Sequence, residues 1–468
     1  MNMLSLTFSY FFLLFFLLYW LLNPWLNIQN GALLLASYAF IASFSISSAI
    51  ILLTYSLLIY ILGEFIHRTN HTRTGYAVLI LLILTFFIAF KYYPASRESL
   101  QLSLSQANMA INLPLMDIII PLGLSFYIFH SVSYIVSIAK KELPPATPLN
   151  ALLYISFFPS VVSGPINRAS HFLPQIATSV PRRLGNVQKP LCLLALAIAK
   201  LFLCSTWLAD QFVNPVFDTP ENATPLQLLV AVYAYAWQIY FNFSGYTNLV
   251  TALAALLGFT LPVNFNAPYR AQNLQAFWGR WHISLSLFIR DYIYIPLGGN
   301  RRGFLRKNVN LLIAMILSGI WHGTGFNFLI WGAIHGAGLV LLNYKNHLFP
   351  VRHSGPIIIL MSRLLTFHFI CFAWIFFRAT DFSTAWAIIT SISQLSASSL
   401  LTAAETPSLI AFLIFFIIYP QLDSLRIKIG ALACRIPWIL FPVPLALFLT
   451  VVFFFSPAGL PGFIYANF

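Results

Sequence analysis

Long apolar runs separated by short polar segments recur along the whole chain. About 20 apolar residues are enough for a helix to cross roughly 30 Å of hydrocarbon, so runs of this length predict about ten transmembrane helices. Their expected ranges are residues 4–22, 31–45, 46–62, 76–93, 114–139, 190–210, 226–260, 364–380, 406–421 and 437–456. The pattern therefore predicts an all-α polytopic membrane protein.

Two further apolar stretches fit a full span less well. Residues 149–165 are short and end in Pro159, Gly164 and Pro165, which favours a re-entrant or interfacial segment. Residues 308–344 contain no Lys, Arg, Asp or Glu, but six glycines interrupt them. We expect this stretch to form two half-depth segments beside a cavity, because irregular backbone at membrane depth must be satisfied by protein or by water.

Composition supports the membrane assignment and excludes other classes. Of the 468 residues 59% are hydrophobic and 8% are charged, whereas about a quarter of the residues in soluble proteins are charged. A soluble enzyme, a disordered chain and a nucleic-acid-binding protein are thereby excluded. The net charge of +14 indicates orientation, because basic residues gather in segments 63–75, 140–189 and 423–435, which we place in the cytoplasm.

His322 is the first candidate for chemistry, because it lies in the middle of the uncharged stretch, within Ser318-Gly-Ile-Trp-His-Gly-Thr-Gly325. A polar ring left without hydrogen bonds there would cost several kcal/mol, so an ionisable group at membrane depth indicates function. The alternative is a structural histidine bonded to a backbone carbonyl. The neighbouring glycines favour a site, because they let a substrate approach the ring and the backbone closely.

His282 is the second candidate. Apolar residues recur at three- and four-residue spacing over 274–289, which predicts an amphipathic helix whose apolar face includes His282 beside Trp278 and Trp281. Segment 270–307 carries seven basic residues and one acidic residue, as interfacial helices often do. Two interpretations stay open: a membrane-surface anchor, or a basic cytoplasmic vestibule that admits an anionic donor.

Metal chemistry is not expected. His322 and His335 stand in the similar strings Trp-His-Gly-Thr-Gly and Ile-His-Gly-Ala-Gly, but the stretch offers no carboxylate or thiol to complete a metal site. A Gly-x-Ser-x-Gly nucleophile elbow is also absent from the sequence. Histidine acting as a general base is the chemistry that remains.

Several strings, taken in order, resemble the membrane-bound O-acyltransferases and, within them, the bacterial alginate O-acetylases. The strings are Pro121-Leu-Gly-Leu-Ser-Phe-Tyr127, Phe157-Phe-Pro with Gly164-Pro-Ile-Asn-Arg168, Gln238-Ile-Tyr-Phe-Asn-Phe-Ser-Gly-Tyr246, Asn264-Phe-Asn-Ala-Pro-Tyr269, Phe277-Trp-Gly-Arg-Trp-His-Ile-Ser-Leu-Ser286, Arg290-Asp-Tyr-Ile-Tyr-Ile-Pro-Leu-Gly-Gly-Asn-Arg301 and Ser318-Gly-Ile-Trp-His-Gly323. The tail Phe463-Ile-Tyr465 is similar too. Each string alone is weak evidence for the resemblance, but the occurrence of all of them in the same order is specific to the family.

The resemblance implies a helical fold around a central funnel or tunnel, with His322 at the position of the family's essential histidine and His282 at that of its second recurrent one. It implies one membrane domain over 1–468, divided into N-terminal spans (1–113), a catalytic core (114–380) and C-terminal spans (381–468). The residues implied to bind substrate are Trp321, Gly323, Trp281, Asn242 and Arg280.

The activity implied by the resemblance is O-acetylation. Acetyl from a cytoplasmic donor, acetyl-CoA, would be delivered across the bacterial inner membrane for modification of an alginate-like polymer, peptidoglycan or another exopolysaccharide. No bound cofactor is implied, and a separate periplasmic or lipid-anchored acetyltransferase is the expected partner. Three alternatives stay open: D-alanyl transfer to teichoic acid, fatty acylation of a protein or lipid, and a non-enzymatic transporter or flippase.

The chain also departs from the family pattern at two positions. Asn242 and Asn248 stand where relatives commonly have Asp. The two replacements remove negative charge near the expected tunnel, and they leave amides that can donate and accept hydrogen bonds.

Overall fold

The computed structural model describes residues 2–107, 109, 111–113, 121–349, 355–396, 403–459 and 461–462. These residues form helices and loops, and no strand occurs among them. The predicted all-α class is therefore confirmed. The chain divides into two compact units: unit 1 comprises Met1–Gly185 and Leu253–Pro262, and unit 2 comprises Asn186–Ala252 and Val263–Phe468.

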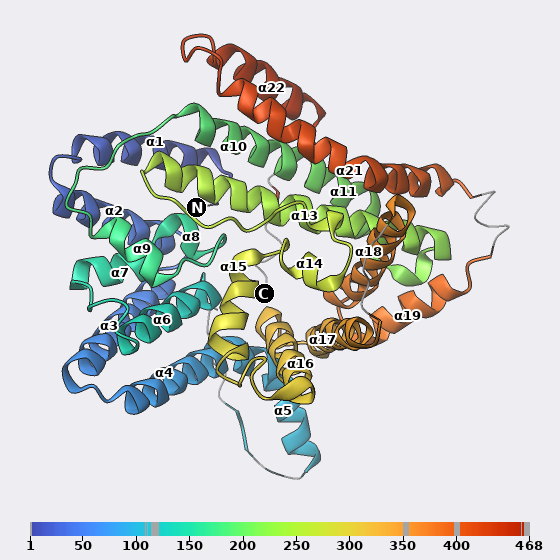
Figure 1. The fold of residues 1–468 in the computed structure, drawn as a ribbon, viewed down its shortest axis with the longest axis horizontal. Helices are drawn as coiled ribbons and strands as arrows, with labels where there is room; N and C mark the ends of the chain where they lie inside the picture. Colours follow the sequence, from blue (N-terminus) through green and yellow to red (C-terminus); the bar gives the residue numbers. More distant parts are fainter. Residues whose placement is uncertain are drawn as a thin grey trace. The chain divides into compact units, whose positions relative to one another are not determined.

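Unit 1 is a bundle in which α3 packs against α2, α6 and α7 (Figure 1). Its helices are α1 (Leu6–Leu21), α2 (Leu26–Ala42), α3 (Ile46–Thr69), α4 (Thr72–Phe87), α5 (Tyr93–Gln106), α6 (Leu124–Ala139), α7 (Pro148–Ser156), α8 (Phe158–Val161) and α9 (Ala169–Ile176). Side-chain caps begin three of them, α1, α3 and α7, because the hydroxyls of Ser5, Ser45 and Thr147 accept hydrogen bonds from backbone N–H groups of the first turn.

The guanidinium of Arg182 is buried inside unit 1 and binds residues from distant parts of the sequence. Its Nη1 donates to Gln29 Oε1 at 2.6 Å, its Nη2 donates to Asn30 Oδ1 at 2.7 Å, and its guanidinium carbon lies 4.6 Å from the centre of the Phe259 ring. The cation therefore joins α2 to the segment Leu253–Pro262, which lies much later in the chain.

Unit 2 contains the remaining helices. They are α10 (Gln188–Ile198), α11 (Thr206–Leu208), α12 (Asn214–Phe217), α13 (Pro225–Leu256), α14 (Leu274–Trp278), α15 (Ile283–Ile289), α16 (Gly303–His322), α17 (Phe326–Leu348), α18 (Pro356–Arg378), α19 (Phe382–Ser393), α21 (Thr406–Ala433) and α22 (Pro442–Phe455). The π-helix η2 (Ala199–Ser205) joins α10 to α11, and the last residues of α13 belong to unit 1.

Seven helical segments within the described residues are long and apolar enough to cross a membrane: Ile46–Thr69, Thr72–Glu98, Gln188–Phe217, Gly303–His322, Phe326–Leu348, Pro356–Arg378 and Thr406–Ala433. Shorter apolar helices overlap the expected ranges 4–22, 31–45, 114–139 and 437–456, and α13 covers most of 226–260. The chain is thus a multi-pass membrane protein. Residues 114–120 and the tail Phe463–Tyr465 lie outside the described residues.

The two stretches expected to be re-entrant differ from each other. Residues 149–165 form the short helices α7 and α8 and a loop, as expected for a segment that does not span. Residues 308–344 do not form half-depth segments: they belong to α16 and α17, which are each long enough to cross the membrane. A pair of full spans also returns the chain to its starting side, so the alternation of loops is preserved.

The glycines explain this correction, because they allow close packing and do not break the helices. A Cβ atom added to Gly332 of α17 would lie 2.5 Å from the carbonyl oxygen of Met315 in α16, and a Cβ on Gly336 would lie 3.3 Å from Leu312 Cα. Small residues let the backbones of membrane helices approach each other in this way. The helices α16 and α17 lie side by side along this contact (Figure 1).

Candidate functional site

His322 is the last residue of α16 and is buried, with 2% of its surface exposed. Aromatic rings surround its imidazole. The distances between ring centroids are 4.7 Å to Trp321, 4.9 Å to Trp331 and 5.2 Å to Phe377. Trp331 comes from α17 and Phe377 from α18, so three spanning helices hold this ring in place.

His282 lies at a break between two helices and not within one amphipathic helix, so this part of the sequence prediction is wrong. Its backbone is left-handed, with a φ of 43°, which is uncommon for a residue other than glycine. The cause is pairing with a distant loop: Asn266 N–H donates to Arg280 O, and Ile283 N–H donates to Asn264 O, each at 3.0 Å. These bonds replace the helical hydrogen bonds that α14 would need to continue.

The side chain of Asn264 also fixes the tautomer of His282. Its Oδ1 accepts from Ser284 N at 3.1 Å and from Ser284 Oγ at 2.8 Å, and it lies 3.2 Å from His282 Nδ1. An amide oxygen accepts only, so His282 Nδ1 carries the proton and Nε2 carries the lone pair. Burial lowers the pKa of His282 from 6.5 to about 3, because desolvation disfavours the imidazolium form.

The ring of Trp321 lies beside both candidate histidines. Its ring centroid is 6.4 Å from that of His282 and 4.7 Å from that of His322. Unit 2 therefore brings together His282, His322 and Trp321, three of the residues singled out from the sequence.

The other predicted substrate-binding residues have different surroundings. Trp281 is buried in an aromatic core, with ring centroids 5.1 Å from Phe265 and 5.2 Å from Trp374. Arg280 Nη1 donates to the carbonyl of Asn266 at 3.0 Å, which ties it to the same loop that breaks the helix. These two side chains support the arrangement around His282.

The space beside Gly323 is filled, because an added Cβ atom would collide with the ring of Phe328. Its backbone is extended and continues into the short turn between α16 and α17. Gly323 therefore permits tight packing next to His322.

The side-chain amides of Asn242 and Asn248, which stand where relatives commonly have carboxylates, both form hydrogen bonds. Asn242 Nδ2 donates to Gly462 O at 2.8 Å and to Ser205 Oγ at 3.3 Å, and a carboxylate could not donate to a carbonyl. Asn248, with its amide oriented to satisfy its neighbours, accepts from Lys200 Nζ at 3.3 Å. Lys200 also donates to Ser244 Oγ at 3.0 Å. The sequence prediction did not include this buried lysine, although a Lys inside an apolar run is a usable signal.

A cavity of about 520 Å³ lies within unit 2 close to these residues. Its wall includes Trp278 from α14, Arg290 at the end of α15, and Lys307 and Ser318 on one face of α16. Lys307 Nζ donates to Asn343 Oδ1 at 3.3 Å. Arg290 is paired with Asp291, with its Nε 2.6 Å from Oδ1, so Lys307 contributes most of the positive charge along the cavity wall.

The cavity wall stops short of His322. Ser318 precedes His322 by four residues, which is about 6 Å along a helix. On the α17 side, the Trp278 ring lies 5.8 Å from Trp331, which in turn contacts His322. The sequence reasoning missed the place of Trp278 and Lys307, although the spacing of 307, 311, 315 and 318 along one helix face could have indicated it.

His335 is a third buried imidazole, on α17. Its ring lies 5.1 Å from Trp278 and 4.8 Å from Trp331, and neither ring nitrogen has a hydrogen-bond partner within the described part of the chain. Trp331 therefore contacts both His335 and His322. Among the same described residues, no group of three or more His, Cys, Asp or Glu side chains is placed to hold a metal ion.

The fold and the site define a class: a polytopic helical membrane protein in which buried imidazoles lie near a basic cavity. A family model described as the membrane-bound O-acyltransferase family matches residues 5–380. The chain belongs to this family, so the resemblance seen in its motifs is confirmed.

Three relatives illustrate the range of the family. A peptidoglycan O-acetyltransferase of Helicobacter pylori is 32% identical over 313 residues, which cover 61% of this chain and 59% of that protein. A probable alginate O-acetylase AlgI of Pseudomonas aeruginosa is 31% identical over 373 residues, covering 76% and 68%. A teichoic acid D-alanyltransferase of Bacillus subtilis is 28% identical over 278 residues, covering 56% and 69%. The chain therefore spans less than two thirds of the Helicobacter protein.

Proposed function

We propose that this protein is an O-acetyltransferase that passes acetyl from a cytoplasmic donor to an extracytoplasmic polysaccharide. The observation that carries the proposal is that His322 and His282 both lie beside the ring of Trp321, inside a membrane-spanning unit. The names of the Helicobacter and Pseudomonas relatives, one acting on peptidoglycan and the other on alginate, support the acetyl group and the polymer class.

In this proposal His322 is the general base. Its ring nitrogen takes the proton from the attacking hydroxyl as the new C–O bond forms, and the C–S bond of the thioester donor then breaks. The imidazolium returns the proton to the departing thiolate. General-base assistance of this kind contributes about 10²- to 10⁴-fold to a rate. His282, with its proton held on Nδ1 and its low pKa, stays neutral and positions Trp321 beside the reaction.

We propose that acetyl-CoA reaches His322 through the basic cavity. The phosphates of such a donor match the charges of Arg290 and Lys307 in the cavity wall. The contact between Trp278 and Trp331 closes the remaining distance to His322, so rotation of Trp278 would admit the acyl group. Trp321, Gly323, Trp281, Asn242 and Arg280 would shape and support the acyl slot.

The proposal extends to the cell as follows. The chain acts as one catalytic membrane domain in the bacterial inner membrane, and a periplasmic or lipid-anchored acetyltransferase is its expected partner on the extracytoplasmic side. The alternative with a specific observation behind it is D-alanyl transfer to teichoic acid, because the Bacillus relative carries that name.

The test uses membranes from cells that express the full chain. Labelled acetyl-CoA is added, and transfer of label to a polysaccharide acceptor is measured for the wild type, for His322→Gln and for the exposed control His67→Gln. We expect His322→Gln to lose at least about 10²-fold in rate, and His67→Gln to keep it. Equal rates for the wild type and His322→Gln would overturn the assignment, and labelling only from a D-alanyl donor would favour the alternative.

A further inference from the structure

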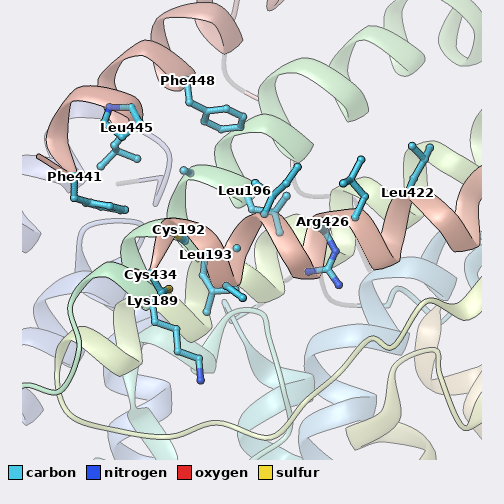
Figure 2. Close-up of a pocket in the computed structure, with 16 residues that line it drawn as sticks. Lys189, Cys192, Leu193, Leu196, Leu422, Arg426, Cys434, Phe441, Leu445 and Phe448 are labelled. Carbon is cyan, nitrogen blue, oxygen red and sulfur yellow. The ribbon is translucent and has the colours of Figure 1, made fainter. Parts of the chain in front are cut away.

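A second cavity lies in unit 2, away from the histidines, between α10, α21 and α22 (Figure 2). Its volume is about 660 Å³, which is within the range of about 300–1,000 Å³ that is usual for ligand sites. We call it the α10–α21–α22 groove. Contacts of α10 with both α21 and α22 hold its three walls together.

The lining of the groove is apolar except at two positions. Each helix contributes apolar side chains to the walls, for example Leu196 of α10, Leu422 of α21 and Phe448 of α22. The two charged residues of the lining are Lys189 and Arg426. Figure 2 shows the amine of Lys189 and the guanidinium of Arg426 on the opposite side of the groove from the Phe441, Leu445 and Phe448 side chains. No carboxylate belongs to the lining.

The groove lies where three helix ends meet. Helix α10 begins at Gln188, α21 ends at Ala433 and α22 begins at Pro442. Gln188 Nε2 donates to the carbonyl of Ile436, which joins the first turn of α10 to the connection between α21 and α22. Lys189 therefore lies beside these helix ends, Arg426 lies seven residues before the end of α21, and the apolar walls extend along the helices.

We propose that this groove binds one anionic phospholipid, with its phosphate at Lys189 and Arg426 and an acyl chain along the apolar walls. Charge complementarity favours this occupant, because both charged residues of the lining are cations and the exposed Lys189 is open to an approaching anion. Arg426 also bonds Asp423, with its Nη2 2.8 Å from Oδ1, so the flexible Lys189 supplies the more available charge. Long basic side chains at helix ends reach headgroups in this way.

A lipid explains the groove better than two other occupants. A free phosphate would use the basic end and leave the apolar walls unexplained. An apolar helix from another protein would fill the walls, but it offers no obligatory anion for Lys189 and Arg426. The groove combines both features, as a phospholipid does.

Two variants test separately the positive charge of Lys189 and the volume of the groove. Lys189→Gln removes a cation, and Lys428→Gln is its matched control, because Lys428 lies on α21 but does not line the groove. Gly430→Phe fills the groove: Gly430 lines it and nothing lies within 4 Å of an added Cβ atom. Any other non-proline residue is better than glycine inside a helix, so the variant should fold. Gly31→Phe, also with nothing within 4 Å, is the control for bulk.

The experiment is native mass spectrometry of the full chain in detergent, titrated with phosphatidylglycerol, with phosphatidylcholine of the same chains, or with inorganic phosphate. We expect one phosphatidylglycerol to be retained in preference to phosphatidylcholine. Lys189→Gln should weaken its retention about two- to fivefold, as loss of one exposed charge pair does, and Gly430→Phe should abolish it. Both controls should behave as the wild type.

Several results would overturn the proposal. Equal retention of the two lipids would show that charge plays no part, and equal losses in Lys189→Gln and Lys428→Gln would show only diffuse attraction. Retention that survives Gly430→Phe would place the lipid elsewhere. Full competition by inorganic phosphate would indicate an anion site, and a co-purifying polypeptide displaced by Gly430→Phe would indicate a helix partner.

Discussion

The contact between α16 and α17 gives the sharpest test of how packing controls the site. In Gly332→Ala the added methyl carbon would lie 2.5 Å from Met315 O and 3.0 Å from Ile316 Cα, whereas ordinary van der Waals contact begins at 3.4 Å. Both obstacles are backbone atoms, which cannot rotate away, so the two helices must part by about 0.9 Å.

The free energy of this change has two opposing parts. Overpacking costs about 1–3 kcal/mol, and replacing a helical glycine by alanine gains about 0.8–1.0 kcal/mol. We therefore expect a net destabilisation of up to about 2 kcal/mol. Gly332 follows Trp331, whose ring contacts His322, and a displacement near 1 Å at a reacting group costs about 10²-fold in rate.

Two measurements check this prediction: thermal unfolding in detergent and acetyl transfer in membranes. The control is Gly31→Ala in α2, where nothing lies within 4 Å of the new methyl group, so it should be at least as stable as the wild type and equally active. If Gly332→Ala unfolds at the wild-type temperature and transfers acetyl at the wild-type rate, glycine does not set the distance between α16 and α17, and our explanation of the uncharged stretch is wrong.

Three further predictions concern the imidazoles and their support. Asn264→Ala removes the oxygen that accepts from the N–H and the hydroxyl of Ser284, and loss of a buried acceptor should cost about 1–3 kcal/mol in thermal unfolding, whereas the exposed Gln272→Ala should cost almost nothing. The pKa of His282 is about 3 in the folded state and about 6.5 in the unfolded state, so between pH 6.5 and 3 only the unfolded state gains a proton. Acidification from pH 7 to 5 should therefore destabilise the wild type by about 2 kcal/mol more than it destabilises His282→Gln. Parallel curves of stability against pH for the two proteins would contradict this. His335→Leu removes a buried ring without hydrogen bonds, so its melting temperature should equal or exceed that of the wild type; a large fall would mean that the ring has a partner.

The helices themselves could be predicted from the sequence, because a membrane span depends on the composition of one continuous segment. The range 46–62, for example, falls inside the helix Ile46–Thr69, and 406–421 falls inside Thr406–Ala433. Helix ends were less certain, because they depend on capping and on neighbours.

The break at His282 could not be predicted in the same way. Apolar spacing over 274–289 favours one helix, and what interrupts it is Asn264, which lies in a separate loop and bonds Ser284. The glycines of 308–344 were misinterpreted for a related reason. Gly332 disrupts an isolated helix, but opposite Met315 it allows a contact that no larger residue permits.

The candidate site was predicted as separate residues and not as an arrangement. His322 and His282 were selected because ionisable groups are costly in hydrocarbon, but their shared contact with Trp321 depends on the tertiary fold. The place of Trp278 and Lys307 in a cavity wall depends on the same packing.

Unit 1 also has a consequence for biogenesis, because its final segment is made long after its first helices. The Tyr19 hydroxyl donates to Leu257 O across a separation of 238 residues, and the Phe259 ring covers the guanidinium of Arg182. A nascent chain halted before residue 253 therefore lacks both contacts. The first helices of unit 1 are therefore incompletely packed until the ribosome has synthesised α13 and the residues that directly follow it.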